Sequence, residues 1–414
     1  MDAEIIAIGS ELLTPRRLDT NSLYLTDALN ALGIEVVAKA VIGDDRARLA
    51  AAVAAAMERS EFVITTGGLG PTEDDVTRDA VSAALGRKLS FRQDLCDAIE
   101  ERFRRMGRKM AEINRRQAFV IDGAETLAND HGTAPGLWIG LGPHRALALL
   151  PGPPRELKPM FERDCLPRLR ALAPPLVIRT LQFRVTGITE SDLDQLIAPV
   201  YTKYENPATT VLAAPGDIQV FLRARCRSGE EAERLLAEVG GPIEALLGDR
   251  IYARDDTTLE GVVGALLREG GHTLAVAESC TGGMLAQRIT SVAGASGYFL
   301  GGLVVYTEEG KRDLLGVPPD VLVKHGAVSE ETARAMASGA REKCGADYAL
   351  AITGEAGPES ATGQPVGTVF VGLAAPEGVT ADRKRWVGDR ERVRLLSTQQ
   401  ALDMLRRSLA RPRH

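Results

Sequence analysis

Small polar residues cluster where a strand is expected to pass into a helix, in the segment "AESCTGGMLAQRI". An apolar run at 273–277 precedes the cluster, and apolar residues at helical spacing follow it. Ser279 in this segment is a candidate nucleophile, but a serine at such a junction is most often the N-cap of the helix. The segment "VVYTEEGK" follows another expected strand, and its Tyr306 and Lys311 favour chemistry over capping.

A serine and a neutral lysine can together hydrolyse an amide or an ester without a histidine. A lysine at its ordinary pKa of about 10.4 is charged at neutral pH, so this hypothesis requires burial, which favours the neutral amine. The N–H groups from Cys280 to Gly283 would stabilise the oxyanion. His272 precedes the expected strand, which makes a serine–histidine pair less attractive. The pattern therefore favours Ser279 with Lys311 as its base, and capping is the alternative.

The segment "TTGGLGPTEDDVTRDA" has the composition of a phosphate-binding loop. Glycines after a strand let a ligand approach the backbone, and the free N–H groups of the following helix suit phosphate. Asp74 and Asp75 add two carboxylates, which need a divalent cation between them and a phosphate. Thr72 to Asp75 also fits a capping box, which explains one aspartate without any function. The glycines that we predict to contact a ligand are Gly67, Gly68 and Gly70.

Three further loops are expected at the same end of the first sheet. "GSELL" offers Glu11, and "NDHGTAPG" (129–136) and "LPGPPRE" (150–156) are turns rich in glycine and proline. In an open parallel sheet, the loops at the carboxyl ends of the strands meet in one crevice. We therefore predict one shared ligand site at this edge.

Short apolar strands alternate with amphipathic helices in the first and last thirds of the chain, which is typical of α/β domains with mostly parallel sheets. We predict an α/β domain at 1–172, a small α+β module at 173–252 and a second α/β domain at 253–414. "APPL" at 173–176 is typical of a linker. The module lacks a basic Gly-x-x-Gly loop and stacking aromatics, so we expect a structural spacer without specific nucleic-acid binding.

The composition narrows the class of protein. With 44% hydrophobic residues, 26% charged residues and a net charge of -6, the chain resembles an ordinary soluble globular protein. The negative charge disfavours sequence-independent nucleic-acid binding, and no apolar stretch approaches the roughly 20 residues of a membrane span. The five cysteines form no CxxC pair, which fits a reducing cytoplasm and gives no zinc site. We therefore expect a cytoplasmic protein that does not enter membranes.

Two ordered sets of motifs resemble the competence/damage-inducible protein CinA family over essentially the whole chain. The first set is "GSELL", "TTGGLGPTEDD", "GTAPG" and "LPGPPRE", and the second is "ESCTGG", "VVYTEEGK", "HGAVSEE" and "GTVFVGL". The resemblance implies a first domain similar to molybdopterin-binding domains, which hydrolyses ADP-ribose with a divalent metal ion. It also implies a KH-like module, a homodimer, and a C-terminal nicotinamide-nucleotide amidase domain, which converts nicotinamide mononucleotide to the acid plus ammonia.

The resemblance also implies roles for individual residues. In the amidase domain it implies Ser279 as the nucleophile, Lys311 as the base and Tyr306 as the partner of the lysine, without a cofactor. The residues that would hold the substrate there are Cys280, Thr281, Gly282, Gly283, Thr353 and Gly354, with Arg392 or Arg394 on its phosphate. In the first domain the metal ligands would be Glu11, Asp74 and Asp75. The substrate-binding residues there would be Gly67, Gly68, Gly70, Thr72, Asn129, Gly132, Thr133, Gly152 and Glu156.

Two positions depart from the family pattern. Pro15 stands where the family has a glycine-bearing loop, and proline removes a backbone donor that a diphosphate would use. Glu355 stands where the family has an apolar residue, and it would add negative charge if it faced the site. The alternative to an enzyme is a non-catalytic molybdopterin-type or nucleotide-binding protein, or a recruitment factor in competence or DNA repair. The joint presence of Ser279, Tyr306 and Lys311 favours the enzyme.

Overall fold

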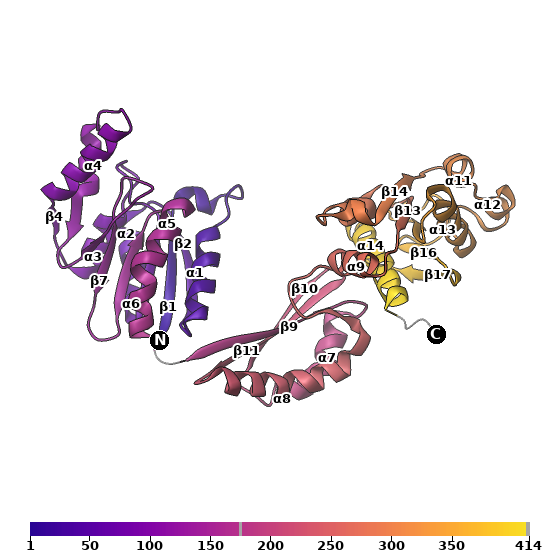
Figure 1. Ribbon diagram of the computed structural model, residues 1–414, viewed down its shortest axis with the longest axis horizontal. Coiled ribbons are helices and arrows are strands. Elements are labelled where there is room, and N and C mark those ends of the chain that lie inside the picture. Colours follow the sequence, from indigo (N-terminus) through magenta and orange to yellow (C-terminus); the bar gives the residue numbers. More distant parts are fainter. Residues whose placement is uncertain (174–175, 411–414) are drawn as a thin grey trace. The chain divides into compact units, whose positions relative to one another are not determined.

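The computed structural model describes residues 1–173 and 176–410, which form two compact units. The first unit contains Met1–Arg179 with Arg225–Glu233, and the second contains Thr180–Ala224 with the residues from Arg234 onward. The predicted α/β class is confirmed, because sheets covered by helices organise both ends of the chain (Figure 1). The middle of the predicted linker, residues 174–175, lies outside the described residues.

A six-stranded sheet in the order β2-β1-β3-β8-β7-β6 organises the first unit. Its strands are β1 (Asp2–Ile8), β2 (Glu35–Ile42), β3 (Phe62–Thr66), β6 (Glu125–Leu127), β7 (Gly136–Gly140) and β8 (Ala146–Leu150). The first four strands of that order run parallel, and the last two are added antiparallel. Because β1 lies between β2 and β3, and the helices that connect these strands lie on opposite faces of the sheet, a crevice is expected at the carboxyl end of β1.

Helices cover both faces of this sheet. On one face the apolar core contains α1 (Thr20–Ala31), α5 (Pro154–Met160) and α6 (Leu166–Leu172), with a π-helical turn between the last two. On the other face it contains α2 (Arg46–Arg59) and α3 (Thr77–Leu85). A separate strand pair, β4 (Leu89–Phe91) and β5 (Phe119–Ile121), lies in the same unit as α4 (Gln93–Arg105). The loops at the carboxyl ends of β1, β3 and β8 are therefore held by a core on each side.

A four-stranded sheet in the order β10-β11-β9-β12 forms the middle module. Its strands are β9 (Val177–Val185), β10 (Ala208–Ala214), β11 (Asp217–Cys226) and β12 (Ile251–Ala253), and its helices are α7 (Glu190–Tyr201) and α8 (Gly229–Leu247). Successive residues of β11 alternate between half-buried and buried positions along the whole strand. This period of two is the pattern of a sheet with one face in the core.

A five-stranded sheet in the order β14-β13-β15-β16-β17 forms the C-terminal region. Its strands are β13 (Leu274–Glu278), β14 (Phe299–Val304), β15 (Tyr348–Gly354), β16 (Thr368–Ala375) and β17 (Gly378–Arg385), of which the last two pair antiparallel. One face packs on α9 (Leu259–Glu269), α10 (Met284–Thr290) and α14 (Arg390–Leu409). The other packs on α11 (Glu308–Leu315), α12 (Pro319–His325) and α13 (Glu330–Cys344). Again the first strand of the sheet, β13, lies between the next two.

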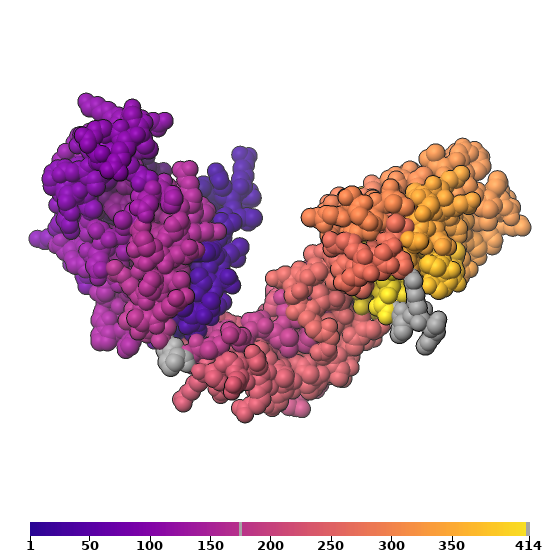
Figure 2. Space-filling model, in the orientation of Figure 1, coloured from indigo at the N-terminus to yellow at the C-terminus, as the bar shows by residue number. Residues whose placement is uncertain are grey.

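The closing helix α14 joins the middle module to the C-terminal sheet, and Figure 2 shows only a small yellow part of it at the surface. The Gln399 amide donates to the Gly216 carbonyl at 2.9 Å, and the Arg406 guanidinium donates to the Asp249 carbonyl at 2.7 Å. These bonds stabilise the module and the C-terminal region as one unit. Within residues 1–173 and 176–410, none of the helices combines the length and the apolar character of a membrane span.

Candidate active site

The turn after β13 places Ser279 beside Lys311 of α11. Nζ of Lys311 lies 3.1 Å from Oγ of Ser279 and 3.4 Å from the carbonyl oxygen of Val305. The serine is 8% exposed and the lysine 2%. Burial lowers the pKa of Lys311 below the ordinary lysine value because an ammonium is poorly solvated there, and the nearby Glu308 opposes this shift only in part. The burial that the serine–lysine hypothesis requires is therefore present.

Ser279 does not cap the helix that follows it. α10 begins at Met284, its N-cap is Gly283, and no side chain of the cap residue bonds to the helix. Residues 279–283 instead form a turn, in which Gly282 and Gly283 have φ angles of 57° and 95°. Side chains with a Cβ rarely adopt such angles, which explains the paired glycines. The capping alternative for Ser279 is wrong.

Glu278, the last residue of β13, takes the place of a cap. Its side chain is fully buried. Its carboxylate accepts hydrogen bonds of 2.8–3.0 Å from three backbone N–H groups at the start of α10, those of Gly283, Leu285 and Ala286. The Gly283 N–H is therefore not available to an oxyanion, contrary to the prediction. Among the described residues no acceptor contacts the N–H groups of Cys280 and Thr281, which directly follow the serine.

Cys280 is the other potential nucleophile of the turn. Burial raises the pKa of its thiol to about 12, so the thiol stays protonated at neutral pH. A thiolate, not a thiol, is the reactive form of cysteine. The geometry and the charge state therefore favour Ser279 over its neighbour.

Tyr306 was predicted to be the partner of Lys311, but its hydroxyl bonds to Arg390 instead. Its side chain is 60% exposed, and its hydroxyl accepts a hydrogen bond of 2.7 Å from Nη2 of Arg390. The other terminal nitrogen of Arg390 donates to the Gly357 carbonyl at 2.7 Å. Arg390 was not predicted as a site residue. Its sequence signal is the spacing of four residues to Arg394, which puts both arginines on one face of α14.

The structure distinguishes the two arginines that the sequence left as alternatives. Nη2 of Arg394 donates to the Thr281 carbonyl at 2.6 Å, and its buried Nε has no partner among the described residues. Arg392 lines a different cavity. Neither Arg390 nor Arg394 has an ion-pair partner in the described part of the chain, in which the pairs of other arginines are numerous. Positive charge without a carboxylate partner therefore lies next to the turn of Ser279.

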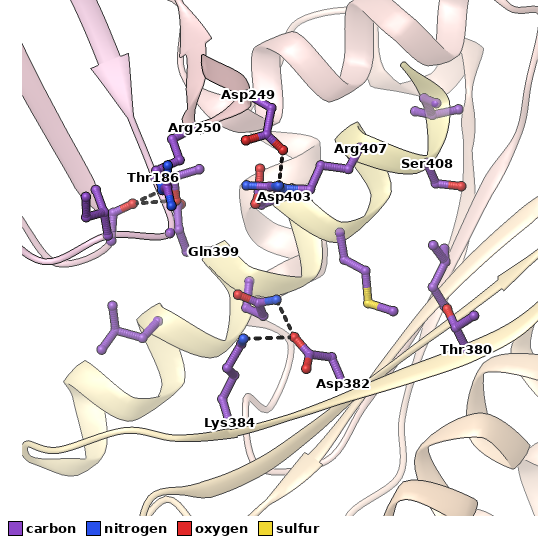
Figure 3. Close-up of a pocket in the computed structure, with 18 of the residues that line it drawn as sticks. Thr186, Asp249, Arg250, Thr380, Asp382, Lys384, Gln399, Asp403, Arg407 and Ser408 are labelled. Carbon is purple, nitrogen blue, oxygen red and sulfur yellow. Dashed lines mark hydrogen bonds and ion pairs between the residues drawn. The ribbon is translucent and has the colours of Figure 1, made fainter. Parts of the chain in front are cut away.

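The cavity that Arg392 lines lies between the middle module, β17 and α14, and it has a volume of about 2180 Å³. In Figure 3, Asp249 of the module points toward Arg407 of α14, with which it forms an ion pair, and Lys384 pairs with Asp382 of β17 at 3.1 Å. The cavity does not include the serine, the lysine or the turn between them. This cavity is therefore not the predicted site.

The last two residues of β15 and the residue that follows them contact the neighbouring loops. The buried Thr353 hydroxyl donates to the Ala327 carbonyl at 2.7 Å. A Cβ on Gly354 would lie 2.7 Å from the Thr368 carbonyl oxygen, which explains the glycine. The Glu355 carboxylate is 6% exposed and accepts two N–H bonds and one hydroxyl bond from residues 361–362. Glu355 therefore stabilises the loop at 361–362. The sequence did not predict this role.

In the first unit the loops after β1, β3 and β8 meet, and these are three of the four loops that the sequence predicted to share a site. A Cβ on Gly67 would lie 2.3 Å from the Ile8 carbonyl oxygen, and a Cβ on Gly152 would lie 3.4 Å from the Gly67 Cα. The Asn21 amide donates to the Thr66 hydroxyl at 3.0 Å and to the Gly152 carbonyl at 2.7 Å. The Asn21 Oδ1 is buried without a partner in the part of the chain that is described.

The loop that contains Asp74 and Asp75 differs from the prediction. α3 begins at Thr77 with Val76 as its N-cap, so the predicted capping box at 72–75 is wrong. Asp75 instead stabilises the loop itself, because its carboxylate accepts from the N–H groups of Gly70 and Thr72, both at 2.8 Å, and from the Thr72 hydroxyl at 2.5 Å. The side chain of Asp74 is exposed.

The predicted metal ligands do not gather. Glu11 lies in the exposed turn Ser10–Leu13, and the carboxylate of Asp75 is already occupied by its own loop. Within the described ranges, no group of three or more histidine, cysteine, aspartate or glutamate side chains is arranged to hold a metal ion. The residues present therefore do not fit a metal site made by the protein alone.

The remaining predicted residues of the first unit form a separate cluster. The Asn129 amide donates to the Glu156 carboxylate at 2.9 Å and to the Ala134 carbonyl at 2.8 Å. A Cβ on Gly132 would collide with the same carboxylate. Thr133, half-buried, lies in this loop. These residues stabilise the loop before β7 against the start of α5.

Three family models match consecutive parts of the chain. They are a probable molybdopterin binding domain at residues 4–171, the damage-inducible protein CinA KH domain at 180–253 and the CinA C-terminal domain at 256–409. A crystal structure of a competence-damaged protein (CinA) superfamily protein from Klebsiella pneumoniae is 35% identical, with a TM-score of 0.37. That match covers 38% of this chain and 99% of the other.

Relatives match the chain along its whole length. A CinA-like protein of Solibacter usitatus is 61% identical over 410 residues, which is 99% of this chain and 98% of that protein. A CinA-like protein of Koribacter versatilis is 46% identical over 413 residues, which is 99% of this chain and 100% of that protein. With the matching domain models in the same order, these similarities show that the chain belongs to the CinA family.

Proposed function

We propose that the C-terminal domain is an amidohydrolase that releases ammonia from nicotinamide mononucleotide. The observation that carries this proposal is the distance of 3.1 Å between Nζ of Lys311 and Oγ of Ser279, both buried. The lowered pKa of Lys311 increases the fraction of neutral amine, which can accept the serine proton.

The reaction follows from these groups. Oγ of Ser279 attacks the amide carbon and its proton passes to Lys311, while the N–H groups of Cys280 and Thr281 donate to the oxyanion. The carbon–nitrogen bond then breaks, and Lys311 returns the proton to the departing ammonia. Water hydrolyses the resulting ester of Ser279, with Lys311 accepting a proton from the water and the serine oxygen recovering one. The products are the acid and ammonia.

The arginines of α14 support a substrate that carries a phosphate. Nη2 of Arg394 donates to a carbonyl, and Arg390 donates to a carbonyl and a hydroxyl. Because these partners are neutral, the positive charge of both arginines is left for an anion. Guanidinium groups bind phosphate through paired N–H donors. A mononucleotide with an amide at one end and a phosphate at the other fits both features.

The test is ammonia release from nicotinamide mononucleotide by the purified full-length protein. We expect release by the parent protein and by Cys280→Ala, and loss of release in Ser279→Ala with the fold retained by circular dichroism. The cysteine variant is the matched control, because it changes the same turn. Equal activity of Ser279→Ala and the parent would contradict the proposal. Absence of ammonia from the parent would favour the non-catalytic binding or recruitment role.

For the first domain we propose binding of ADP-ribose at the carboxyl ends of β1, β3 and β8. The support is the close approach of Gly67 and Gly152 beside the unpartnered Oδ1 of Asn21. Loops at the carboxyl ends of parallel strands, beside a change in strand order, are where sheets of this kind bind ligands. Calorimetric titration of ADP-ribose into the parent and into Asn21→Ala tests this, with binding expected to weaken in the variant. Hydrolysis with a divalent metal, like the homodimer, the cytoplasmic location and the absence of specific nucleic-acid binding, stays a prediction.

A further inference from the structure

The buried carboxylate of Glu278 is not explained by the proposed chemistry, since in the described part of the chain it forms no hydrogen bond with Ser279 Oγ or Lys311 Nζ. It has no ion-pair partner in the described part of the chain, although it is 0% exposed. A charged group in such a position is expensive unless hydrogen bonds and dipoles compensate it. Its compensation here is the three N–H groups at the positive end of α10.

We propose that Glu278 is a positioning residue, which holds the turn 279–283 so that Ser279 stays within reach of Lys311. This inference rests on the proposed function of the same site. Glu278 directly precedes Ser279, and its side chain bonds across the turn to N–H groups four or more positions after the serine. The turn between these two anchors has little freedom left, because its ends are tied to one carboxylate.

The backbone of Glu278 contributes a second set of anchors. Its carbonyl accepts the Val305 N–H at 2.8 Å, and the Val305 carbonyl in turn accepts from Nζ of Lys311 at 3.4 Å. The following N–H, of Ser279, donates to the Ile352 carbonyl at 2.9 Å. The side chain of Glu278 therefore connects the serine turn to α10. Its main chain bonds to Val305, which follows β14 and accepts a bond from Lys311.

If Glu278 only capped α10, its loss would reduce the folded fraction of the protein, and the folded molecules would keep their activity. A positioning residue affects the chemical step itself, because a displacement of about 1 Å of a reacting group lowers the rate by about 100-fold. The two roles are therefore separated by kcat measured on folded protein.

The experiment compares Glu278→Gln and Glu278→Asp with Thr258→Ala in the full-length chain. Glutamine keeps the size but loses one acceptor oxygen, and aspartate keeps the charge but is one methylene shorter. Thr258 caps α9 through the Gly261 N–H and contacts no site residue described above, so it is the matched cap control. The measurements are kcat and KM for ammonia release, the pH profile, and folding by near-ultraviolet circular dichroism.

We expect kcat of Glu278→Gln to fall by about 100-fold, with KM little changed because the arginines of α14 are untouched. We expect a smaller fall for Glu278→Asp, none for Thr258→Ala, and no movement of the acid limb of the pH profile. Parental kcat in folded Glu278→Gln would overturn the proposal in favour of a simple cap. A shift of the acid limb to lower pH would overturn it in favour of charge tuning of Lys311.

A second readout does not depend on the substrate. The rate at which a fluorophosphonate probe labels Ser279 in the parent and in Glu278→Gln reports the position of the serine directly. We expect labelling of the parent to be faster, and equal rates would contradict the role of Glu278. If the parent is labelled but releases no ammonia, the proposed substrate fails while the comparison of labelling rates still decides the positioning role. Should Glu278→Gln not fold, Glu278→Asp carries the same comparison.

Discussion

The first sheet and the C-terminal sheet have the same arrangement of their opening strands, but their sites differ. In both, the first strand lies between the second and the third, β1 between β2 and β3 and β13 between β14 and β15. At the end of β13 a buried serine meets a buried lysine. In the first unit, Glu11 after β1 is exposed, and Asp75 in the loop after β3 bonds to its own loop.

The two sheets share a strand order that is expected to form a crevice. The difference between their sites shows that the chemistry of such a crevice depends on whether its polar side chains are buried. In the C-terminal domain Ser279 and Lys311 are buried, and burial lowers the pKa of Lys311 below the ordinary lysine value. In the first unit the loops are stabilised by their own hydrogen bonds, and the amide oxygen of Asn21 is buried without a partner among the described residues. The first arrangement suits covalent chemistry by the protein, and the second suits binding of a ligand that brings its own charge.

The largest expected effect is that of Lys311→Met, which removes the buried base. We expect ammonia release to fall by about 1000-fold or more, as when one member of a catalytic unit is removed. Lys311→Arg is the charged control and should be equally inactive, because an arginine does not deprotonate in proteins. Activity of either variant near the parental level would show that the C-terminal site does not use Lys311 as a base. The contrast with the first unit would then be lost.

The pH dependence follows from the direction of the lysine shift. Because the pKa of Lys311 is lowered, parental activity should rise with pH, with a midpoint below the ordinary value of about 10.4. The buried ammonium destabilises the folded state below the lowered pKa, and this penalty fades as pH approaches about 10.4. Lys311→Met should therefore raise the free energy of unfolding at neutral pH, and this gain should shrink toward high pH. Urea unfolding at several pH values checks it, and a loss of stability at neutral pH would contradict the burial argument.

A smaller effect is expected for the phosphate of the substrate. Arg394→Ala should raise KM for nicotinamide mononucleotide by about 10- to 100-fold, the size of a lost charged contact. Arg392→Ala should leave KM unchanged, because this arginine lines the other cavity. Steady-state kinetics on the two variants compare positions two residues apart on the same helix. Equal changes in KM would remove the distinction that the structure makes between them.

The corresponding test in the first unit concerns stability. Asp75→Asn should lower the free energy of unfolding by about 1–2 kcal/mol, since one carboxylate oxygen loses its role as an acceptor. The exposed Asp74→Asn should change stability little, and neither variant should affect ammonia release. Urea unfolding and ADP-ribose cleavage with added Mg²⁺ are the measurements. Loss of metal-dependent cleavage in Asp74→Asn, with unchanged stability, would show that this site also uses a protein carboxylate and would break the comparison.

The smallest effect is expected for Tyr306→Phe. The hydroxyl positions Arg390 from an exposed location, so its loss should raise KM by about three- to tenfold, the equivalent of one net hydrogen bond. The pH profile should not move, because the tyrosine does not contact Lys311. A shifted profile would restore the predicted partnership of the two residues.

The sequence predicted the elements whose apolar patterns were strong and missed those without one. β17 reads "GVTADRKR", a mostly polar run at the edge of the sheet in which none of the residues is fully buried, so its pattern gave no strand signal. α3 begins at Thr77, after the predicted capping box at 72–75, because the Asp75 carboxylate holds the preceding residues in a loop. In both cases the structure depends on pairing or local bonds that periodicity does not report.

The candidate site divides in the same way. Ser279 and Lys311 carried a signal in their residue types and in the strands that precede them, and their contact is a consequence of parallel neighbours. Glu278 carried none, because a glutamate at a strand end is usually exposed, and only the fold shows which N–H groups surround it. The partner of Tyr306 also required the fold, because Arg390 lies on the last helix of the chain.

The position of α14 has a consequence for proteins assembled from different sets of domains. One face of this helix reaches the serine turn through Arg394, and the other bonds to the middle module through Gln399 and Arg406. A C-terminal domain without the module would expose the second set, whose partners lie on the module. Positions 399 and 406 should therefore differ between chains that contain the module and chains that lack it, whereas position 394 should not. Residue identities at three positions of one helix would then report domain architecture and site chemistry separately.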